Sequence, residues 1–226
     1  MNTPKKNKFY MPAEWYPHKC CWMQWPYENP NHNSYGDVLS WSHFDFEKGR
    51  IAWANVAKSI SEFEKVKMIV HPNELNKAKN ILDSRIQIIE LKIDDCWARD
   101  SGAIFLLNDK NKLGGVDWKF NGWGKFQPFD SDNKIAKFMI ESSNASYFKN
   151  NMVLEGGSIH VDGEGTLLTT EQCLLNKNRN PNLSKKEIEK NLKDYLGINK
   201  IIWLKNGTDE GTDGHVDNIA CFLNSG

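Results

Sequence analysis

Residues 100–107 read DSGAIFLL, so an acidic side chain stands directly before a run typical of a hairpin strand. Related arrangements return in residues 155–162 (EGGSIHVD) and in residues 217–224 (DNIACFLN). Equivalent strands would each bring one acidic residue to a common centre, as in a pseudosymmetric α/β propeller. Three short matches also arise by chance, so the pattern alone leaves the repeat open.

Between these stretches the chain alternates between helical and extended patterns. Apolar residues recur at helical spacing in residues 49–64. Ser184 with Glu187 forms a capping box that begins a helix over residues 184–196, and Gly197 is suited to end it. Further helices are expected at 73–83 and 134–141, strands at 66–70, 86–93, 103–107, 113–120, 151–154, 158–161, 166–170 and 200–204, and a loop at 12–33. The sequence therefore predicts an α/β protein, and we expect a single domain over residues 1–226.

The composition excludes several classes of function. Formal net charge is +0 and basic residues are scattered, so the electrostatic footprint of a nucleic-acid-binding protein is missing. The basic N-terminus is followed by no apolar run, and no segment is long enough to span a bilayer, which favours the cytoplasm. The 5 cysteines include no CxxC pair, which argues against a disulfide framework and a zinc ribbon. We expect no cofactor.

The sharpest chemical motif is residues 212–218, TDGHVDN. On an extended chain His215 and Asp217 share one face, so an imidazole and a carboxylate can point at the same substrate. This arrangement suits a proton-transferring histidine beside a carboxylate that holds a cation. A metal site and a purely structural His–Asp pair are the alternatives. Because His160, the nearest other histidine, is far away in sequence, we expect no metal.

Two further motifs set acidic residues among glycine and aromatic residues. In residues 94–102 (DDCWARDSG), Arg99 and Asp100 would project in different directions, so that one pairs structurally while the other faces a ligand. A solvated turn leading into a hairpin is the plainer interpretation. In residues 154–163 (LEGGSIHVDG), Glu155 lies beside paired glycines and can reach into the space that they leave.

Four motifs, taken in order, resemble the agmatine deiminases and the related bacterial peptidylarginine deiminases. They are Trp-x-Arg-Asp-x-Gly, Asp117-Trp118 followed by Phe120-Asn121-x-Trp123-Gly124, Leu-Glu-Gly-Gly-x-Ile-His-Val-Asp-Gly-x-Gly, and Thr-Asp-Gly-His-Val-Asp-Asn. The similarity runs from about residue 10 to the end of the sequence. It implies the pentein fold, a five-bladed α/β propeller of pseudosymmetric ββαβ modules. About three of the five blades would be present in this chain.

The resemblance also implies a reaction. In that family a cysteine thiolate attacks the guanidinium carbon, ammonia leaves, and water releases the carbonyl product from a thiouronium intermediate. Agmatine would give N-carbamoylputrescine, a step of putrescine biosynthesis. Carried over by motif, Asp100 and Asp217 would grip the guanidinium nitrogens, and His215 would be the general acid and base. Trp97 would stack on the guanidinium, and Glu155 would be a further carboxylate of the substrate pocket.

The family's nucleophile has no counterpart in this sequence. That cysteine ends a glycine-rich Gly-Gly-x-x-His-Cys loop close to the family's C-terminus, and this sequence contains no such loop. Cys96 adjoins Trp97 but lies outside the fixed residues of its motif, and Cys221 is expected to be a core residue of an apolar strand. The remaining cysteines, Cys20, Cys21 and Cys173, match no catalytic position.

We therefore expect the N-terminal portion of an agmatine deiminase, inactive by itself. A peptidylarginine deiminase-like enzyme and a non-catalytic guanidine-binding remnant are the alternatives. The expected partner is a small guanidine, with no nucleic acid and no membrane. Blade faces left uncovered would favour self-association or a complementing C-terminal polypeptide.

Overall fold

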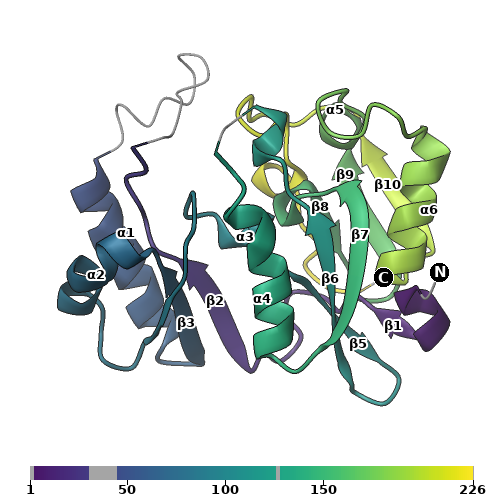
Figure 1. Ribbon diagram of the computed structural model, residues 1–226. Helices are drawn as coiled ribbons and strands as arrows, with labels where there is room; N and C mark the ends of the chain where they lie inside the picture. Colours follow the sequence, from purple (N-terminus) through teal and green to yellow (C-terminus); the bar gives the residue numbers. More distant parts are fainter. Residues whose placement is uncertain (1–2, 31–44, 126–127, 226) are drawn as a thin grey trace. The chain divides into compact units, whose positions relative to one another are not determined.

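The structure, a computed structural model, describes residues 3–30, 45–125 and 128–225 (Figure 1). The chain divides into two compact units. The larger comprises Met1–Tyr16, Arg99–Lys125 and Asn133–Gly226, and the smaller comprises Pro17–Ala98 and Phe126–Asp132. Both are mixed α/β, as the sequence predicts, and the single-domain expectation stays a prediction. Within the described ranges, no helix has the length and apolar character needed to cross a membrane.

The larger unit contains a ββαβ module that begins at the predicted hairpin. Strands β5 (Ile104–Asn108) and β6 (Leu113–Lys119) pair antiparallel. Helix α4 (Ile135–Ser142) then returns the chain to β7 (Ser146–Val153), which pairs parallel with β6. A parallel neighbour requires such a crossover, whereas antiparallel strands need only a tight turn. The short strand β1 (Phe9–Tyr10) extends the sheet beside β5.

A second module repeats this order. Strands β8 (Ile159–Val161) and β9 (Thr166–Thr170) pair antiparallel. Helix α6 (Lys185–Leu196) leads to β10 (Lys200–Leu204), which is parallel to β9. Both modules pack on one core, and along β5 buried side chains alternate with partly exposed ones. The ββαβ repeat implied by the resemblance is thus present twice in this unit.

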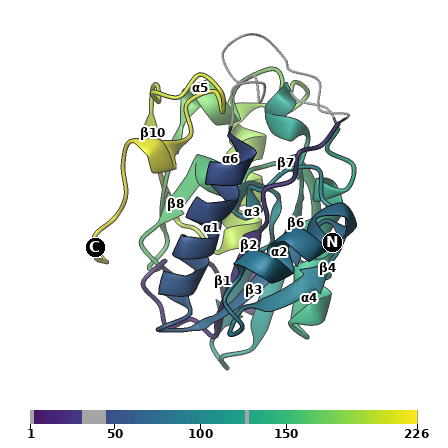
Figure 2. The same cartoon turned by 90° about the vertical axis from the view of Figure 1, so that its left-hand side faces the viewer.

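The smaller unit is a parallel sheet with helical crossovers. Its strand order is β2 (Cys20–Gln24), β3 (Lys65–Val70) and β4 (Gln87–Glu90). Helices α1 (Phe46–Ile60) and α2 (Leu75–Ile81) lie side by side in Figure 2. The buried core of this unit includes Trp25, Ala57, Val66, Met68 and Ala78.

Short helical segments connect these elements. They are η1 (Pro4–Asn7), η3 (Pro72–Glu74), α3 (Ala98–Ser101), η4 (Gly122–Gly124), η5 (Asp132–Lys134), η6 (Gly156–Ser158), α5 (Glu171–Leu174) and η7 (Val216–Asn218). Three of them, α3, η6 and η7, carry or adjoin the acidic residues at which the three sequence matches begin.

Two sequence-based expectations are wrong. Part of the expected loop at 12–33 is strand β2, which pairs with β3 along its whole length. The strand expected at 217–224 does not form, because the amides of Ile219 and Ala220 both donate to the carbonyl oxygen of Val216 and close a turn. Cys221 is consequently exposed rather than part of a core.

The predicted capping box of α6 is confirmed and can be tested. Ser184 Oγ accepts from the Glu187 amide at 3.4 Å, and Glu187 Oε2 accepts from the Ser184 amide at 2.8 Å. Ser184→Ala removes the first bond, so the free energy of unfolding in urea should fall by about 1 kcal/mol. Lys186→Ala, an exposed change in the same helix, should alter it by less than about 0.5 kcal/mol. Equal effects of the two changes would contradict the role of the cap.

Candidate active site

Asp100 is a largely buried carboxylate, 10% exposed, and both of its oxygens accept hydrogen bonds. Its Oδ1 accepts from the Gly157 amide at 2.8 Å, and its Oδ2 accepts from Trp123 Nε1 at 3.0 Å. Trp123 reaches it from η4, where its own backbone has a φ of 55°. Two segments distant in sequence, those of Gly157 and Trp123, therefore fix the direction of this one carboxylate.

Gly157 is the point at which the site residues converge. A Cβ atom built on it would lie 2.6 Å from His215 Nδ1, 2.7 Å from Asp217 Oδ2 and 2.8 Å from Asp100 Oδ1. Only a residue without a side chain leaves this space to the imidazole and the two carboxylates. The structure thus brings together Asp100, His215 and Asp217, as the motifs predict. It does so although His215 and Asp217 enter a helical turn instead of an extended strand.

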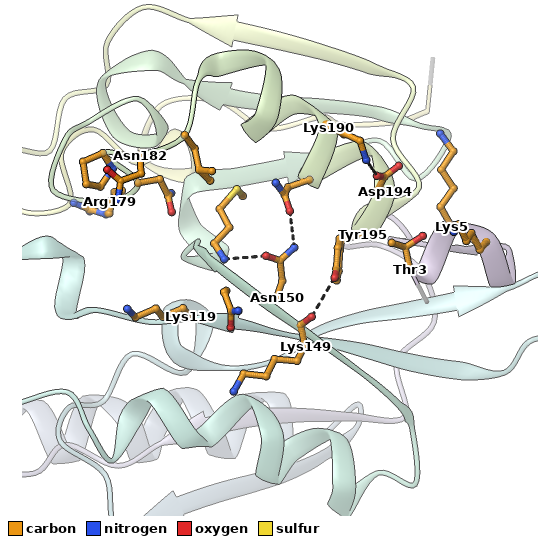
Figure 3. A pocket seen from close by; sticks show the side chains of 17 residues that line it. Thr3, Lys5, Lys119, Lys149, Asn150, Arg179, Asn182, Lys190, Asp194 and Tyr195 are labelled. Carbon is orange, nitrogen blue, oxygen red and sulfur yellow. Dashed lines mark hydrogen bonds and ion pairs between the residues drawn. The ribbon is translucent and has the colours of Figure 1, made fainter. Parts of the chain in front are cut away.

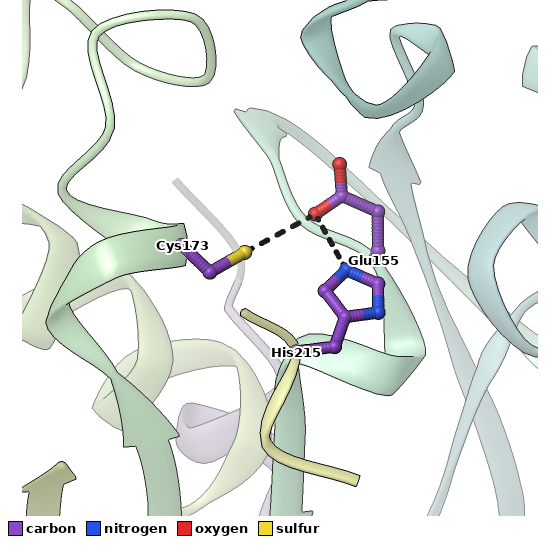
Figure 4. Close-up of side chains that lie close together, drawn as sticks. All are labelled: Glu155, Cys173 and His215. Atoms are coloured by element: carbon purple, nitrogen blue, oxygen red, sulfur yellow. Dashed lines mark hydrogen bonds and ion pairs between the residues drawn. The ribbon is translucent and has the colours of Figure 1, made fainter. Parts of the chain in front are cut away.

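Glu155 lies on the other side of the His215 ring (Figure 4). Its Oε1 accepts from Arg179 Nε at 2.7 Å, and its Oε2 lies 3.7 Å from His215 Nε2, an ion-pair distance. The thiol of Cys173 faces the same Oε2 at 4.0 Å. Glu155 and His215 are both almost fully inaccessible to solvent. The imidazole is thus flanked by Glu155 on Nε2 and by Asp100, at 3.8 Å, on Nδ1.

The charges in this cluster control each other's protonation. Burial alone would lower the pKa of His215, but the carboxylates of Glu155, Asp100 and Asp217 outweigh it and raise that pKa above 6.5. Burial would raise the pKa of Glu155, but His215 and Arg179 lower it. Burial raises the pKa of Asp100. The cluster therefore favours a protonated imidazole beside an ionised Glu155.

Arg99 and Asp100 do diverge, as expected of these neighbours. Arg99 Nε lies 3.1 Å from Asp217 Oδ2, and its Nη2 donates to Glu14 Oε1 at 2.6 Å. Glu14 also lies 3.3 Å from His160 Nε2, and His160 with Arg99 lowers the pKa of Glu14 to about 2. Arg99 is therefore the structural partner of Asp217, and Asp100 is the residue that faces His215.

Within the described parts of the chain, one set of side chains gathers closely enough to hold a metal ion. Ligand atoms of Glu155, Cys173 and His215 all lie within 4.8 Å of one another (Figure 4). However, Arg179 already pairs with Glu155, and burial with the Glu155 charge raises the pKa of Cys173 well above 9.0. The arrangement is that of an ion-pair network around a neutral thiol.

Trp97, the remaining residue expected at the site, belongs to the smaller unit. There its ring meets the ring of Trp53 edge to face, with centroids 5.7 Å apart, and it is 43% exposed. Its stacking on a substrate guanidinium stays a prediction.

Sequence reasoning missed three residues that hold the site. Trp123 stands between two glycines, and nothing in that run indicates that its indole N–H donates to Asp100. Asp213 lies inside the TDGH motif, and its carboxylate binds Lys125 at 2.6 Å and Arg179 at 2.7 Å. Arg179 stands in the polar run 176–182, where no local pattern signals a buried ion pair.

A separate hollow of about 1180 Å³ also occurs in the larger unit (Figure 3). Arg179 is part of its lining, but Asp100, Glu155, His215 and Asp217 are not. Lysines dominate the charged residues around it: Lys5, Lys6, Lys119, Lys149 and Lys190. The hollow is therefore distinct from the cluster around Gly157.

The chain has relatives among known proteins. Residues 10–226 match the family model described as Porphyromonas-type peptidyl-arginine deiminase. The chain belongs to this family. A protein of Legionella pneumophila is 49% identical over 230 residues, which cover 100% of this chain and 64% of that protein. The agmatine deiminase of Pseudomonas aeruginosa is 45% identical, with 100% of this chain and 61% of the relative covered.

Solved structures of the family share the fold. The agmatine deiminase of Enterococcus faecalis superposes with a TM-score of 0.89 at 39% identity, covering 99% of this chain and 60% of its own. A substrate-bound agmatine deiminase of C. jejuni gives 0.81 at 31% identity, covering 96% and 62%. The pentein-type fold, with about three blades represented by the three sheets, is confirmed. The chain spans less than two thirds of the length of the curated relatives it matches.

Gly157→Ala tests the convergence of the site. The added methyl group would force Asp100 away from its position, so the indole N–H of Trp123 should lose its hydrogen bond. We expect an upfield shift of that proton in NMR spectra and faster exchange with D2O. Gly115→Ala is the matched control, because its methyl group would meet Ile140 in the core instead. It should destabilise the protein and leave the Trp123 resonance in place, and a Trp123 resonance insensitive to Gly157→Ala would contradict the geometry.

Proposed function

We propose that this chain carries the guanidinium-binding and proton-transferring residues of an agmatine deiminase. The observation that carries the proposal is the convergence of two carboxylates and an imidazole on Gly157. The names of the relatives from Pseudomonas aeruginosa and Enterococcus faecalis support agmatine as the guanidine. The products would be N-carbamoylputrescine and ammonia.

Binding follows from the shape and charge of a guanidinium. Its planar fork of N–H donors is matched by carboxylates, and charge-assisted bonds of this type are strong. Asp217 already binds one guanidinium, that of Arg99, at 3.1 Å. Asp100 is oriented in advance by Gly157 and Trp123. Such fixed carboxylates hold the guanidinium carbon in one position for attack, which lowers the entropic cost of the reaction.

His215 would transfer the protons. After a thiolate adds to the guanidinium carbon, the C–N bond breaks, and the departing nitrogen takes a proton from the imidazolium and leaves as ammonia. The neutral imidazole then accepts a proton from water, whose oxygen attacks the thiouronium carbon and releases the thiolate and the carbamoyl product. The raised pKa of His215 supports this cycle, because it keeps the proton available near neutral pH.

Among the cysteines in the larger unit, Cys173 lies beside Glu155. Its thiol is unsuited to act as the nucleophile, because it is held in its protonated form. Its side chain is fully buried, and burial with the neighbouring Glu155 carboxylate raises its pKa well above 9.0. A thiol must lose its proton to attack. We propose that Cys173 packs against Glu155 as a neutral thiol and that the nucleophile is not Cys173.

Calorimetric titration of the chain with agmatine tests the binding half of this proposal. Wild type should bind agmatine more tightly than putrescine, which has amines but no guanidinium. Asp217→Asn removes one charge-assisted contact and should weaken agmatine binding by about tenfold or more. Asp194→Asn, which changes a carboxylate paired with Lys190 on α6, should have no effect.

Two results would count against the proposal. If Asp217→Asn left the affinity for agmatine unchanged, the Asp217 carboxylate would not be part of the binding site. Tighter binding of a blocked arginine peptide than of agmatine would favour the peptidylarginine deiminase alternative.

A further inference from the structure

Arg179 connects the two segments that carry the candidate reaction residues. Its Nε donates to Glu155 Oε1 at 2.7 Å. On its other side, Nη1 donates to Asp213 Oδ2 at 2.7 Å and Nη2 donates to the carbonyl oxygen of Thr212 at 3.1 Å. Thr212 and Asp213 directly precede the segment that bears His215. The planar guanidinium of Arg179 thus joins the backbone segment that carries His215 to the carboxylate of Glu155.

The bridge is completely enclosed. The side chains of Arg179 and Glu155 are both 0% exposed. A buried charge without a partner is strongly unfavourable, and removing one member of a buried pair leaves the other uncompensated. Asp213 in turn has Lys125 Nζ at 2.6 Å, so the charges alternate from Lys125 through Asp213 and Arg179 to Glu155.

We propose that Arg179 is a positioning residue of the site, which fixes the Glu155 carboxylate beside the His215 imidazole and supplies its counter-charge. The inference rests on the proposed function only for the reaction steps given to His215. Asn178 supports the bridge, because its Oδ1 accepts from Arg179 and its Nδ2 donates to Asp213 at 2.9 Å.

The groups facing this bridge come from several elements. Glu155 is faced by Arg179, by Cys173 of α5 and by His215. His215 is faced in addition by three acidic residues, Asp100 of α3, Asp217 of η7 and Asp209 of the preceding loop. Of the groups facing Glu155, Arg179 is the one that remains a cation at all working pH values. Removing Arg179 should therefore raise the pKa of Glu155.

The carboxyl titration of Glu155, followed by NMR of protein labelled with ¹³C at glutamate, tests the proposal without requiring turnover. In Arg179→Gln the midpoint of Glu155 should rise by about one pH unit or more, because an adjacent cation has been lost. The midpoint of His215 should fall in the same sample, because a Glu155 carboxylate that is no longer held beside the ring stabilises the imidazolium less. Arg85→Gln, which breaks a surface pair with Asp83 in the smaller unit, should change neither midpoint.

Arg179→Lys keeps the charge but cannot reproduce the planar bridge, and it serves if Arg179→Gln does not fold. Its Glu155 midpoint should rise less than in Arg179→Gln, while the His215 midpoint should still fall as the two segments separate. Unchanged Glu155 and His215 midpoints in the folded Lys variant would overturn the proposal. Loss of agmatine affinity with unchanged midpoints would also overturn it, because binding would then depend on Arg179 by another route.

Discussion

The interaction on which the larger unit depends is the contact of one fully buried carboxylate, that of Glu155, with two cationic partners. A carboxylate withdrawn from water is stable in its charged form only when its oxygens are paired. Arg179 pairs one oxygen and His215 faces the other. The remaining charges follow from these two: Asp213 balances Arg179, and Asp100 with Asp217 holds the imidazole from the opposite side. Gly157 permits this concentration of charge, because any side chain there would occupy the space that it needs.

Local patterns in the sequence were sufficient to predict much of the fold. The hairpins and α6 form where alternation, turn residues and the Ser184 cap place them, since these signals depend on neighbouring residues alone. Strand β2 was missed because its neighbours Pro17 and Pro26 suggest a loop, while its pairing with β3 lies far along the chain. The expected strand at 217–224 fails for a related reason: an apolar run becomes a strand only when its amides find a partner strand, and here they close a turn.

The sequence predicted some residues of the site and missed others. Motif order identified Asp100, His215 and Asp217, which the structure brings together, and the catalytic roles assigned to them stay predictions. Glu155, expected only as a further pocket carboxylate, lies at an ion-pair distance of 3.7 Å from His215 Nε2. Arg179 was not predicted, because a buried ion pair depends on two distant segments and produces no periodic pattern in the sequence of either one. The placement of Trp97 at the substrate likewise stays a prediction.

His215, although buried, is held as an imidazolium by the carboxylates around it. Because its pKa is raised in the folded state, its stabilising contribution is complete below pH 6.5 and is lost as the pH rises through the folded value. NMR titration of the His215 ring in the wild-type chain measures this most directly. We expect a midpoint above 6.5, the ordinary value for histidine. A midpoint below 6.5 would show instead that burial outweighs the carboxylates and that the imidazolium is not stabilised.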